Sequence, residues 1–162
     1  MNQEILKAKE AIVKEVAENM KKSSSIVVVE YRGMTVAEMT ELRRTLRKDN
    51  ATMTVYKNSL VERAADELGY HDLKTTLVGP NALIFSEDTI AGPKIAAKFA
   101  KKHEDLMIKG GVVEGRVVDA AGIKTVATLP GREGLISMFL SCLQAPVRNF
   151  ACAVKAVAEK EN

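Results

Sequence analysis

The sequence has little cysteine and histidine, and it has no long hydrophobic run. Its two cysteines, Cys142 and Cys152, would lie about 15 Å apart on one helix, too far for a disulfide bond. Free thiols of a reducing compartment are therefore expected. No apolar run approaches the roughly 18–20 residues of a membrane-spanning helix. The polar start of the chain also lacks a secretory signal, so we expect a cytoplasmic protein without a membrane partner.

Motifs for catalysis and for cofactor binding are also missing. The two histidines, His71 and His103, have no cysteine or histidine at the spacing of metal ligands. The glycines Gly110, Gly111 and Gly115 match neither the dinucleotide-binding fingerprint nor the phosphate-binding loop of nucleotide hydrolases. Hairpin turns explain them better. We therefore expect no cofactor, no metal ion and no enzymatic activity.

Helical and strand patterns alternate over residues 1–130. Helices are predicted over residues 2–22, from Thr35 onward, from Asn58 to about Gly69, from Pro93 to Lys102 and near 120–128. Strands are predicted at 26–29, 52–57 and 82–85 and within 106–118. Thr35 and Glu38 have the spacing of a capping box, and Asn58 or Ser59 can cap the next helix. Crossovers of this length favour an α/β fold, a small sheet with helices packed on it.

The strand signal is lost from Gly131 onward, so residues 1–130 and 131–162 are predicted to be separate domains. One amphipathic segment runs from Leu135 to Leu143, and Pro146 interrupts it. Pro146 suits the first turn of a second helix, whose apolar positions are Val147, Phe150, Ala151, Val154 and Val157. A helix of about 17 residues is marginal alone in water. It therefore either packs on the chain's own domain or projects to a separate partner.

The net charge of +3 identifies no partner, but basic residues are concentrated between Arg43 and Arg63. That segment has two acidic residues and six basic ones, namely Arg43, Arg44, Arg47, Lys48, Lys57 and Arg63. Such a patch favours docking to phosphates, although a solvated helix face has the same pattern. Arg32 lies nearby in a predicted turn. Gly33 would permit close backbone approach or simply make the turn, and Asn58 would add amide hydrogen bonds or simply cap a helix.

An ordered series of short motifs runs through most of the chain. It consists of Tyr31-Arg32-Gly33-Met34-Thr35-Val36, Leu42-Arg43, Val55-Tyr56-Lys57-Asn58-Ser59-Leu60, Gly79-Pro80-Asn81-Ala82, Lys109-Gly110-Gly111, Glu114-Gly115 and Leu129-Pro130. In this series the chain resembles the family of the bacterial large-subunit ribosomal protein L10. Ser59 and Asn81 stand where threonine is usual in the family, and both keep a small polar group.

The resemblance implies a structural protein at the base of the ribosomal stalk, with a ferredoxin-like α/β sandwich and a projecting carboxyl-terminal amphipathic helix. It implies that the amino-terminal domain binds 23S rRNA beside ribosomal protein L11. The residues expected to bind RNA are Arg32, Gly33, Arg43, Arg44, Arg47, Lys57, Asn58 and Arg63.

For the carboxyl-terminal helix the resemblance implies a different partner, dimers of the stalk protein L7/L12, which recruit translational GTPases. The residues expected to bind L7/L12 are Val147, Phe150, Ala151, Val154 and Val157. The length of this tail leaves room for about two dimers.

Two other functions remain open at this point. A free regulatory RNA-binding protein, which represses its own messenger, would use the same basic residues. A small-molecule enzyme would use the basic patch for an anionic substrate and would need a concave pocket with convergent polar groups. Co-purification with ribosomal subunits and L7/L12 would separate the stalk protein from both.

Overall fold

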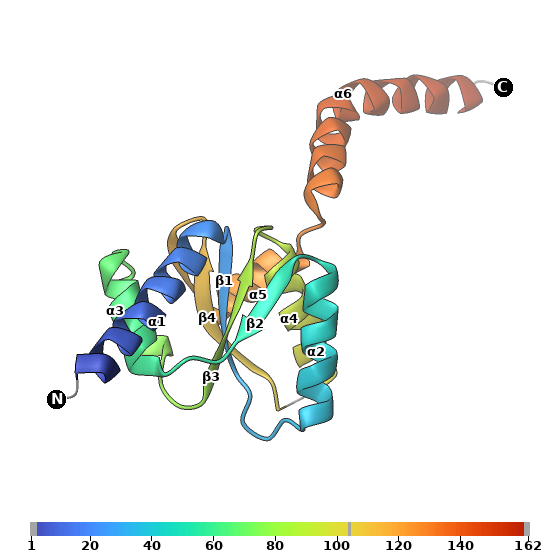
Figure 1. Cartoon of the computed structure of the whole chain (residues 1–162). Helices are drawn as coiled ribbons and strands as arrows, with labels where there is room; N and C mark the ends of the chain where they lie inside the picture. The colour runs from blue at the N-terminus through green and yellow to red at the C-terminus, as the bar shows by residue number, and fades with distance from the viewer. Residues whose placement is uncertain (1–2, 104, 161–162) are drawn as a thin grey trace. The chain divides into compact units, whose positions relative to one another are not determined.

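The computed structural model describes residues 3–103 and 105–160, apart from the side chains at 3–6, 132, 157, 158 and 160. The chain divides into two compact units, Met1–Thr128 and Leu129–Asn162. The first unit contains a five-stranded antiparallel sheet with helices packed on it, and the second contains one long helix (Figure 1). The expected α/β fold class is confirmed.

The elements follow one another in an almost regular alternation. They are α1 (Gln3–Lys22), β1 (Ser25–Glu30), α2 (Val36–Lys48), β2 (Ala51–Thr54), α3 (Asn58–Glu67), the 3-10 helix η1 (His71–Thr76), β3 (Asn81–Ser86), α4 (Ala91–Ala100), β4 (Met107–Val113), β5 (Arg116–Asp119), α5 (Ala120–Thr128) and α6 (Arg132–Lys160). The strand order is β2-β3-β1-β4-β5. The first four strands therefore have the antiparallel order of a ferredoxin-like sheet, with β5 added at one edge.

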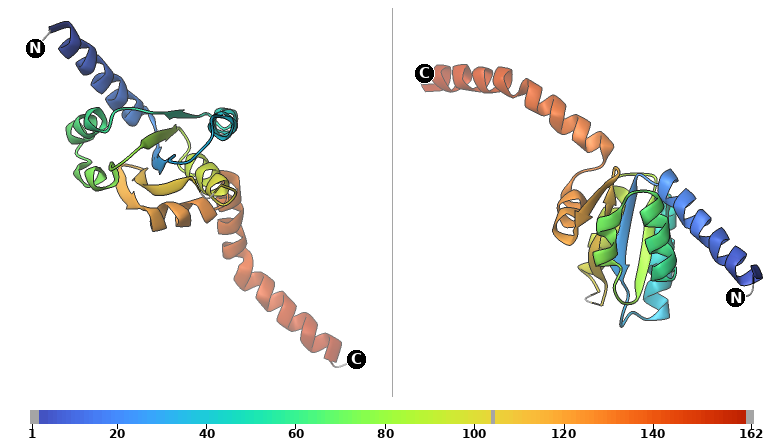
Figure 2. Two further views of the ribbon diagram at one scale, coloured as in Figure 1. Left: turned by 90° about the horizontal axis from the view of Figure 1, so that it is seen from below. Right: turned by 90° about the vertical axis from the view of Figure 1, so that its left-hand side faces the viewer.

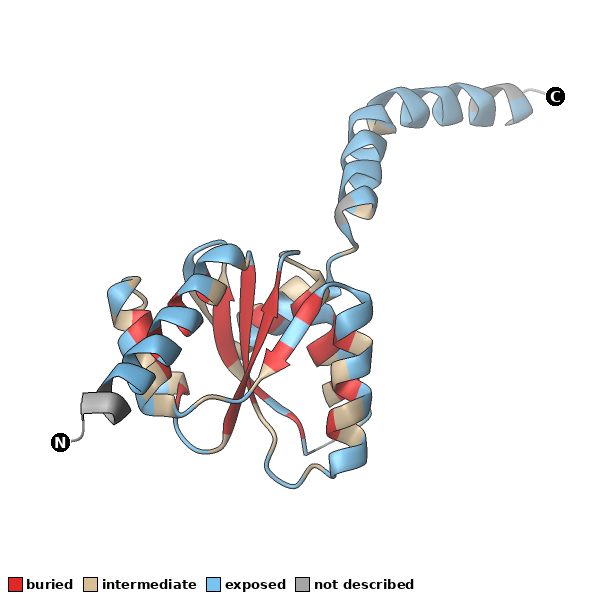
Figure 3. Cartoon of the chain, in the orientation of Figure 1, coloured by how far each residue is buried: buried red, intermediate tan, exposed pale blue. Residues whose placement is uncertain are grey.

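Helices cover both faces of the sheet (Figure 2), and an apolar core lies on each face. Alternate residues of β1 supply both cores, because successive side chains of a strand point to opposite faces. Val27 and Val29 pack with residues of α2, α4 and α5, whereas Ile26 and Val28 pack with residues of α1, α3 and η1. Consequently β3 is buried along its whole length, and β1 is buried except at Glu30 (Figure 3).

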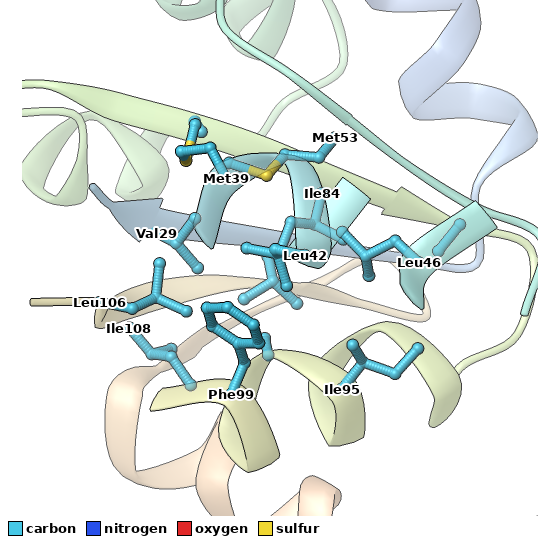
Figure 4. Close-up of a cluster of buried hydrophobic side chains, with 14 of the residues drawn as sticks. Val29, Met39, Leu42, Leu46, Met53, Ile84, Ile95, Phe99, Leu106 and Ile108 are labelled. Carbon is cyan, nitrogen blue, oxygen red and sulfur yellow. The ribbon is translucent and has the colours of Figure 1, made fainter. Parts of the chain in front are cut away.

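Helix α2 forms as its sequence predicts. The Thr35 hydroxyl accepts a hydrogen bond from the Glu38 backbone N–H, and the Glu38 carboxylate accepts one from the Thr35 backbone N–H at 2.7 Å. Met39, Leu42 and Leu46 are buried, each contributing roughly 1.5–3 kcal/mol. They pack beside Phe99 of α4 in the core shown in Figure 4. This packing fixes α2 and α4 on the same face of the sheet.

The prediction of hairpin turns at Gly110 and Gly111 is wrong, because both glycines lie within β4. The β4–β5 turn consists of Glu114 and Gly115. A Cβ at Gly111 would lie only 2.1 Å from the Ile26 carbonyl oxygen, so this position needs glycine for close approach to β1.

A β-bulge lies beside these glycines. Val28 pairs with Gly110 but Val29 pairs with Ile108, which leaves Lys109 as an extra residue in β4. As a result, Ile108 and Val112 enter opposite cores although they are four residues apart.

The second predicted strand and the cap of the third helix also need correction. β2 ends at Thr54, and Val55 is 43% exposed. The N-cap of α3 is Lys57, without a side-chain capping bond. The Asn58 side chain instead donates a hydrogen bond to the Gly79 carbonyl oxygen at 2.9 Å. Asn58 therefore holds a distant loop rather than its own helix.

Pro146 does not begin a second helix, since α6 continues through it. Proline has no backbone N–H to donate to the Cys142 carbonyl, and its ring crowds that carbonyl, so a bend is expected. Figure 1 shows α6 bending part-way along its length. The residues before and after Pro146 therefore belong to one bent helix.

Candidate functional site

Four connecting segments meet at one end of the sheet, which we call the loop end. Glu30 at the end of β1 pairs with Asn81 at the start of β3 and with Met107 at the start of β4. The turn after β1 and the residues that precede β3 and β4 therefore lie together. The link from β2 to α3 joins them, because Asn58 donates its hydrogen bond to Gly79 there.

Arg32 and Gly33 form the turn that leaves β1. The Met34 backbone N–H donates to the Tyr31 carbonyl at 3.2 Å, and Gly33 has a φ of +100°. A Cβ at Gly33 would lie 2.7 Å from Oδ1 of Asp105. Both the positive φ and the closeness of Asp105 therefore favour glycine at position 33, whether or not RNA binds there. Arg32 beside it is exposed.

A chain of polar contacts ties this turn to the core. One oxygen of Glu38 accepts hydrogen bonds from the Thr35 N–H and hydroxyl at 2.7 and 2.8 Å, and the other lies 3.1 Å from Nδ1 of His103. The His103 ring stacks on Phe99, with centroids 4.2 Å apart. The hydrogen bonds from Thr35, helped by His103, hold the pKa of Glu38 below its usual value. Ionised Glu38 therefore fixes the end of the Arg32–Gly33 turn.

A second network holds the loop before β3. Lys109, the extra residue of the β4 bulge, donates to the Val78 carbonyl, and its ammonium lies 2.6 Å from the Glu30 carboxylate. Asn58 donates to the next carbonyl along, that of Gly79. Lys109 is therefore neutralised by Glu30, and Asn58 has one amide donor already committed. Both residues therefore stabilise the backbone of the loop before β3.

The eight residues predicted to bind RNA are only partly brought together. Arg32, Gly33, Lys57 and Asn58 lie at the loop end. Arg43, Arg44 and Arg47 follow α2 away from it, with Arg43 partly exposed and the other two exposed. Arg63 is exposed on α3, which packs on the opposite face of the sheet. The basic segment from Arg43 to Arg63 is thus divided between two faces.

None of the six cations among these eight residues forms an ion pair with a described side chain. Their positive charge is therefore available to an external anion.

Sequence reasoning missed four exposed lysines on and just after α4. They are Lys94, Lys98, Lys101 and Lys102. Their signal is the spacing of three and four residues within a stretch, residues 91–102, that contains no aspartate or glutamate. We call these four residues the lysine ridge.

Helix α6 leaves its apolar side chains exposed. Of the large hydrophobic residues that are exposed in the described part of the chain, nine belong to α6: Leu135, Ile136, Met138, Phe139, Leu140, Leu143, Val147, Phe150 and Val154. Ala151 is exposed as well, and the side chain of Val157 lies outside the described residues. The first half of α6, which the sequence left unassigned, is thus as exposed as the predicted binding segment.

Within residues 3–103 and 105–160, no group of three or more His, Cys, Asp or Glu side chains could hold a metal ion. No helix among those residues has the length and apolarity needed to cross a membrane. An α/β unit with exposed cations at its loop end, followed by a helix with exposed apolar residues, is typical of a scaffold protein that binds other macromolecules.

Comparison with known proteins specifies the class further. Residues 4–101 match the family model of ribosomal protein L10, and residues 129–162 match that of the ribosomal protein uL10 C-terminal region. The large ribosomal subunit protein uL10 of Bacillus cereus (strain B4264) is 50% identical over 158 residues, which is 97% of this chain and 95% of that protein. The corresponding protein of Staphylococcus epidermidis (strain RP62A) is 52% identical over the same shares.

The chain belongs to the ribosomal protein L10 family. The resemblance found in the sequence is therefore confirmed. The members of this family are structural, non-enzymatic proteins of the large ribosomal subunit in the cytoplasm, which confirms the expectations of a cytoplasmic location and of no enzymatic activity.

Proposed function

We propose that this protein forms the base of the stalk of the large ribosomal subunit. Its first unit binds 23S rRNA beside ribosomal protein L11, and α6 binds dimers of L7/L12, which recruit translational GTPases. Family membership supports this assignment as a whole. The observation that carries the RNA-binding part is the loop end. Arg32 and Lys57 come from positions 25 residues apart in the sequence, and the Asn58–Gly79 hydrogen bond and the Lys109–Glu30 ion pair hold the backbone there.

The chemistry of the loop end suits the backbone of a folded RNA. Folded RNA is recognised largely through phosphates and shape, and exposed guanidinium and ammonium groups meet phosphates well. The two nearby tyrosine rings are engaged elsewhere, since Tyr31 packs against the core. Tyr56 donates to Glu15 at 3.1 Å and packs edge-on against Phe85, and burial together with the Glu15 contact raises its pKa. We therefore expect phosphate contacts rather than base stacking at this end.

The RNA assignment is tested with Lys57→Ala and Arg43→Ala in the full chain. Each lost phosphate contact should lower the slope of log affinity against log salt by roughly one unit. Titration of a 23S rRNA fragment over a series of salt concentrations measures this slope. Unchanged affinity and an unchanged slope in both variants would contradict the assignment.

The exposed apolar face of α6 supports the second half of the proposal. An amphipathic helix whose apolar residues lack a partner fits a helix-in-groove complex. Two segments carry large apolar residues, one before Pro146 with Phe139 and one after it with Phe150 and Val154, and both side chains of phenylalanine are more than 60% exposed. We assign the dimers to the segment after Pro146, whose length gives room for about two of them.

Native mass spectrometry of the complex with L7/L12 tests this stoichiometry. The full chain should carry two dimers. A chain truncated after Cys152 lacks Val154 and Val157 and should carry fewer. Three dimers on the full chain, or two on the truncated one, would show that this assignment of α6 is wrong.

A further inference from the structure

The lysine ridge concentrates positive charge on one helix. Lys94 and Lys98 belong to α4, Lys101 is its C-cap, and Lys102 follows. All four side chains are exposed, and none forms an ion pair with a side chain that the structure describes. With no acidic residue between 91 and 102, this charge is not compensated within its own helix.

The stability of α4 explains only part of this arrangement. Lys98 lies in the last turn and Lys101 is the C-cap, where cations interact favourably with the helix dipole, but Lys94 lies at the other end. Lys94 lies at the positive end of the helix dipole, where the first turn has no acidic residue and the N-cap Ile90 makes no side-chain capping bond. Lys94 and Lys98 are four residues apart, a spacing at which like charges repel. Both features destabilise the free helix, which favours an external anion as the reason for a lysine at position 94.

The ridge is continuous with the loop end. Lys101 and Lys102 lead directly into His103, which contacts Glu38. Asp105 beyond it lies beside Gly33 of the Arg32–Gly33 turn, close enough that a Cβ at Gly33 would meet its carboxylate. From this junction the ridge runs back along α4 for about 10 Å to Lys94. A polyanion bound at the loop end would therefore meet the ridge without leaving the surface of the first unit.

We propose that the lysine ridge is a second phosphate-binding surface, which holds the backbone of the same rRNA that binds the loop end. The inference rests on the proposed RNA-binding function. RNA is the occupant that the continuity favours, because one strand can supply phosphates to both places. Lysines suit this role because their ammonium groups are mobile point charges. Contacts to phosphates need no hydrogen bonds to the bases.

The test uses Lys98→Glu in the full chain, titrated with deproteinised 23S rRNA over a series of salt concentrations. The affinity at low salt should fall roughly ten-fold and the salt slope by about one unit. The thermal unfolding temperature should not fall, because the introduced carboxylate lies four residues from both Lys94 and Lys102. Should this variant unfold early, Lys98→Gln replaces it, with the same expected loss of slope.

Lys9→Glu is the matched control. Lys9 is exposed on α1, which packs on the opposite face of the sheet, and its replacement changes the net charge by the same amount. It should leave affinity and slope near the values of the unmodified chain. If Lys98→Glu or Lys98→Gln behaved like this control, the ridge would not bind RNA and the inference would be overturned.

Lys57→Ala, measured in parallel, separates the two proposals. If it loses affinity while the Lys98 variants do not, only the ridge is refuted. If Lys57→Ala also retains full affinity and slope, the RNA-binding function of the loop end fails as well. If the ridge binds an acidic protein surface instead of RNA, only Lys57→Ala should lose affinity for rRNA, and the Lys98 variants should keep it.

Discussion

Gly33 sets the path of the chain between β1 and α2. Replacement by alanine would place a Cβ at a φ of +100° and 2.7 Å from the Asp105 carboxylate. We expect Gly33→Ala to lower the free energy of unfolding by roughly 1–2 kcal/mol and to displace the turn that presents Arg32. Urea unfolding measures the first effect and rRNA titration the second.

Gly69→Ala separates strain from crowding. Gly69 also has a positive φ, of +80°, but a Cβ there would meet no atom within 4 Å. This variant should show only the conformational part of the loss, and it should leave RNA affinity unchanged. Adding Asp105→Ala to Gly33→Ala should recover the crowding part. Equal stability losses at Gly33 and Gly69 would show that the Asp105 contact contributes nothing.

Glu38 gives the fold a predictable dependence on pH. The Thr35 contacts lower its pKa from 4.5 in the folded state, so its ionised form stabilises the fold above that pH. This contribution is lost as the pH falls through the lowered pKa. Glutamine mimics the protonated acid, so Glu38→Gln should be less stable than the unmodified chain at pH 7, and the difference should shrink as the pH falls below 4.5. Urea unfolding across this range measures the difference, and a gap independent of pH would contradict the role of the charge.

At the scale of elements, the β4 bulge depends on Lys109. Its ammonium pairs with a Glu30 carboxylate whose side chain is only 18% exposed. Lys109→Met should cost roughly 1–3 kcal/mol of unfolding free energy, because it leaves that carboxylate without a partner. The double variant Lys109→Met/Glu30→Leu should recover much of the loss in urea unfolding. Additive losses in this cycle would mean that the two groups do not interact.

The bulge also shows where sequence patterns stop being informative. The apolar stripe of α2 and the Thr35–Glu38 cap follow from local spacing, so the sequence predicts them correctly. The role of Gly111 depends on the backbone of β1, more than 80 residues away, so a local pattern reads it as a turn. Asn58 is similar, because its partner Gly79 lies 21 residues further on.

Helix α6 was divided wrongly for another reason. Proline usually stops or starts a helix, and that preference placed a boundary at Pro146. The carbonyl it leaves unpaired belongs to Cys142, an exposed residue, so water can satisfy that carbonyl. The cost of proline within the helix is thereby reduced, and α6 continues with a bend.

At the scale of the whole molecule, the predicted site depends on the strand order. Alternating helices and strands predict an α/β fold, but only the pairing shows which connections share an end of the sheet. Consequently the sequence grouped Arg43 with Arg63, which lie on opposite faces. It also overlooked Lys94 and Lys98, which the loop before β4 connects to the Arg32–Gly33 turn. The distribution of charge along the sequence therefore identified only part of the proposed RNA-binding surface.

Hydrogen–deuterium exchange of the full chain, with and without 23S rRNA, tests the central claim most directly. The account predicts that RNA slows exchange at residues 31–35, 55–58 and 78–80, three of the four segments that meet at the loop end. It predicts no change on the exposed side of α1, which lies on the other face of the sheet. Protection confined to α1 and α3, with unchanged exchange in the three loop segments, would contradict the assignment of the loop end as the RNA-binding surface.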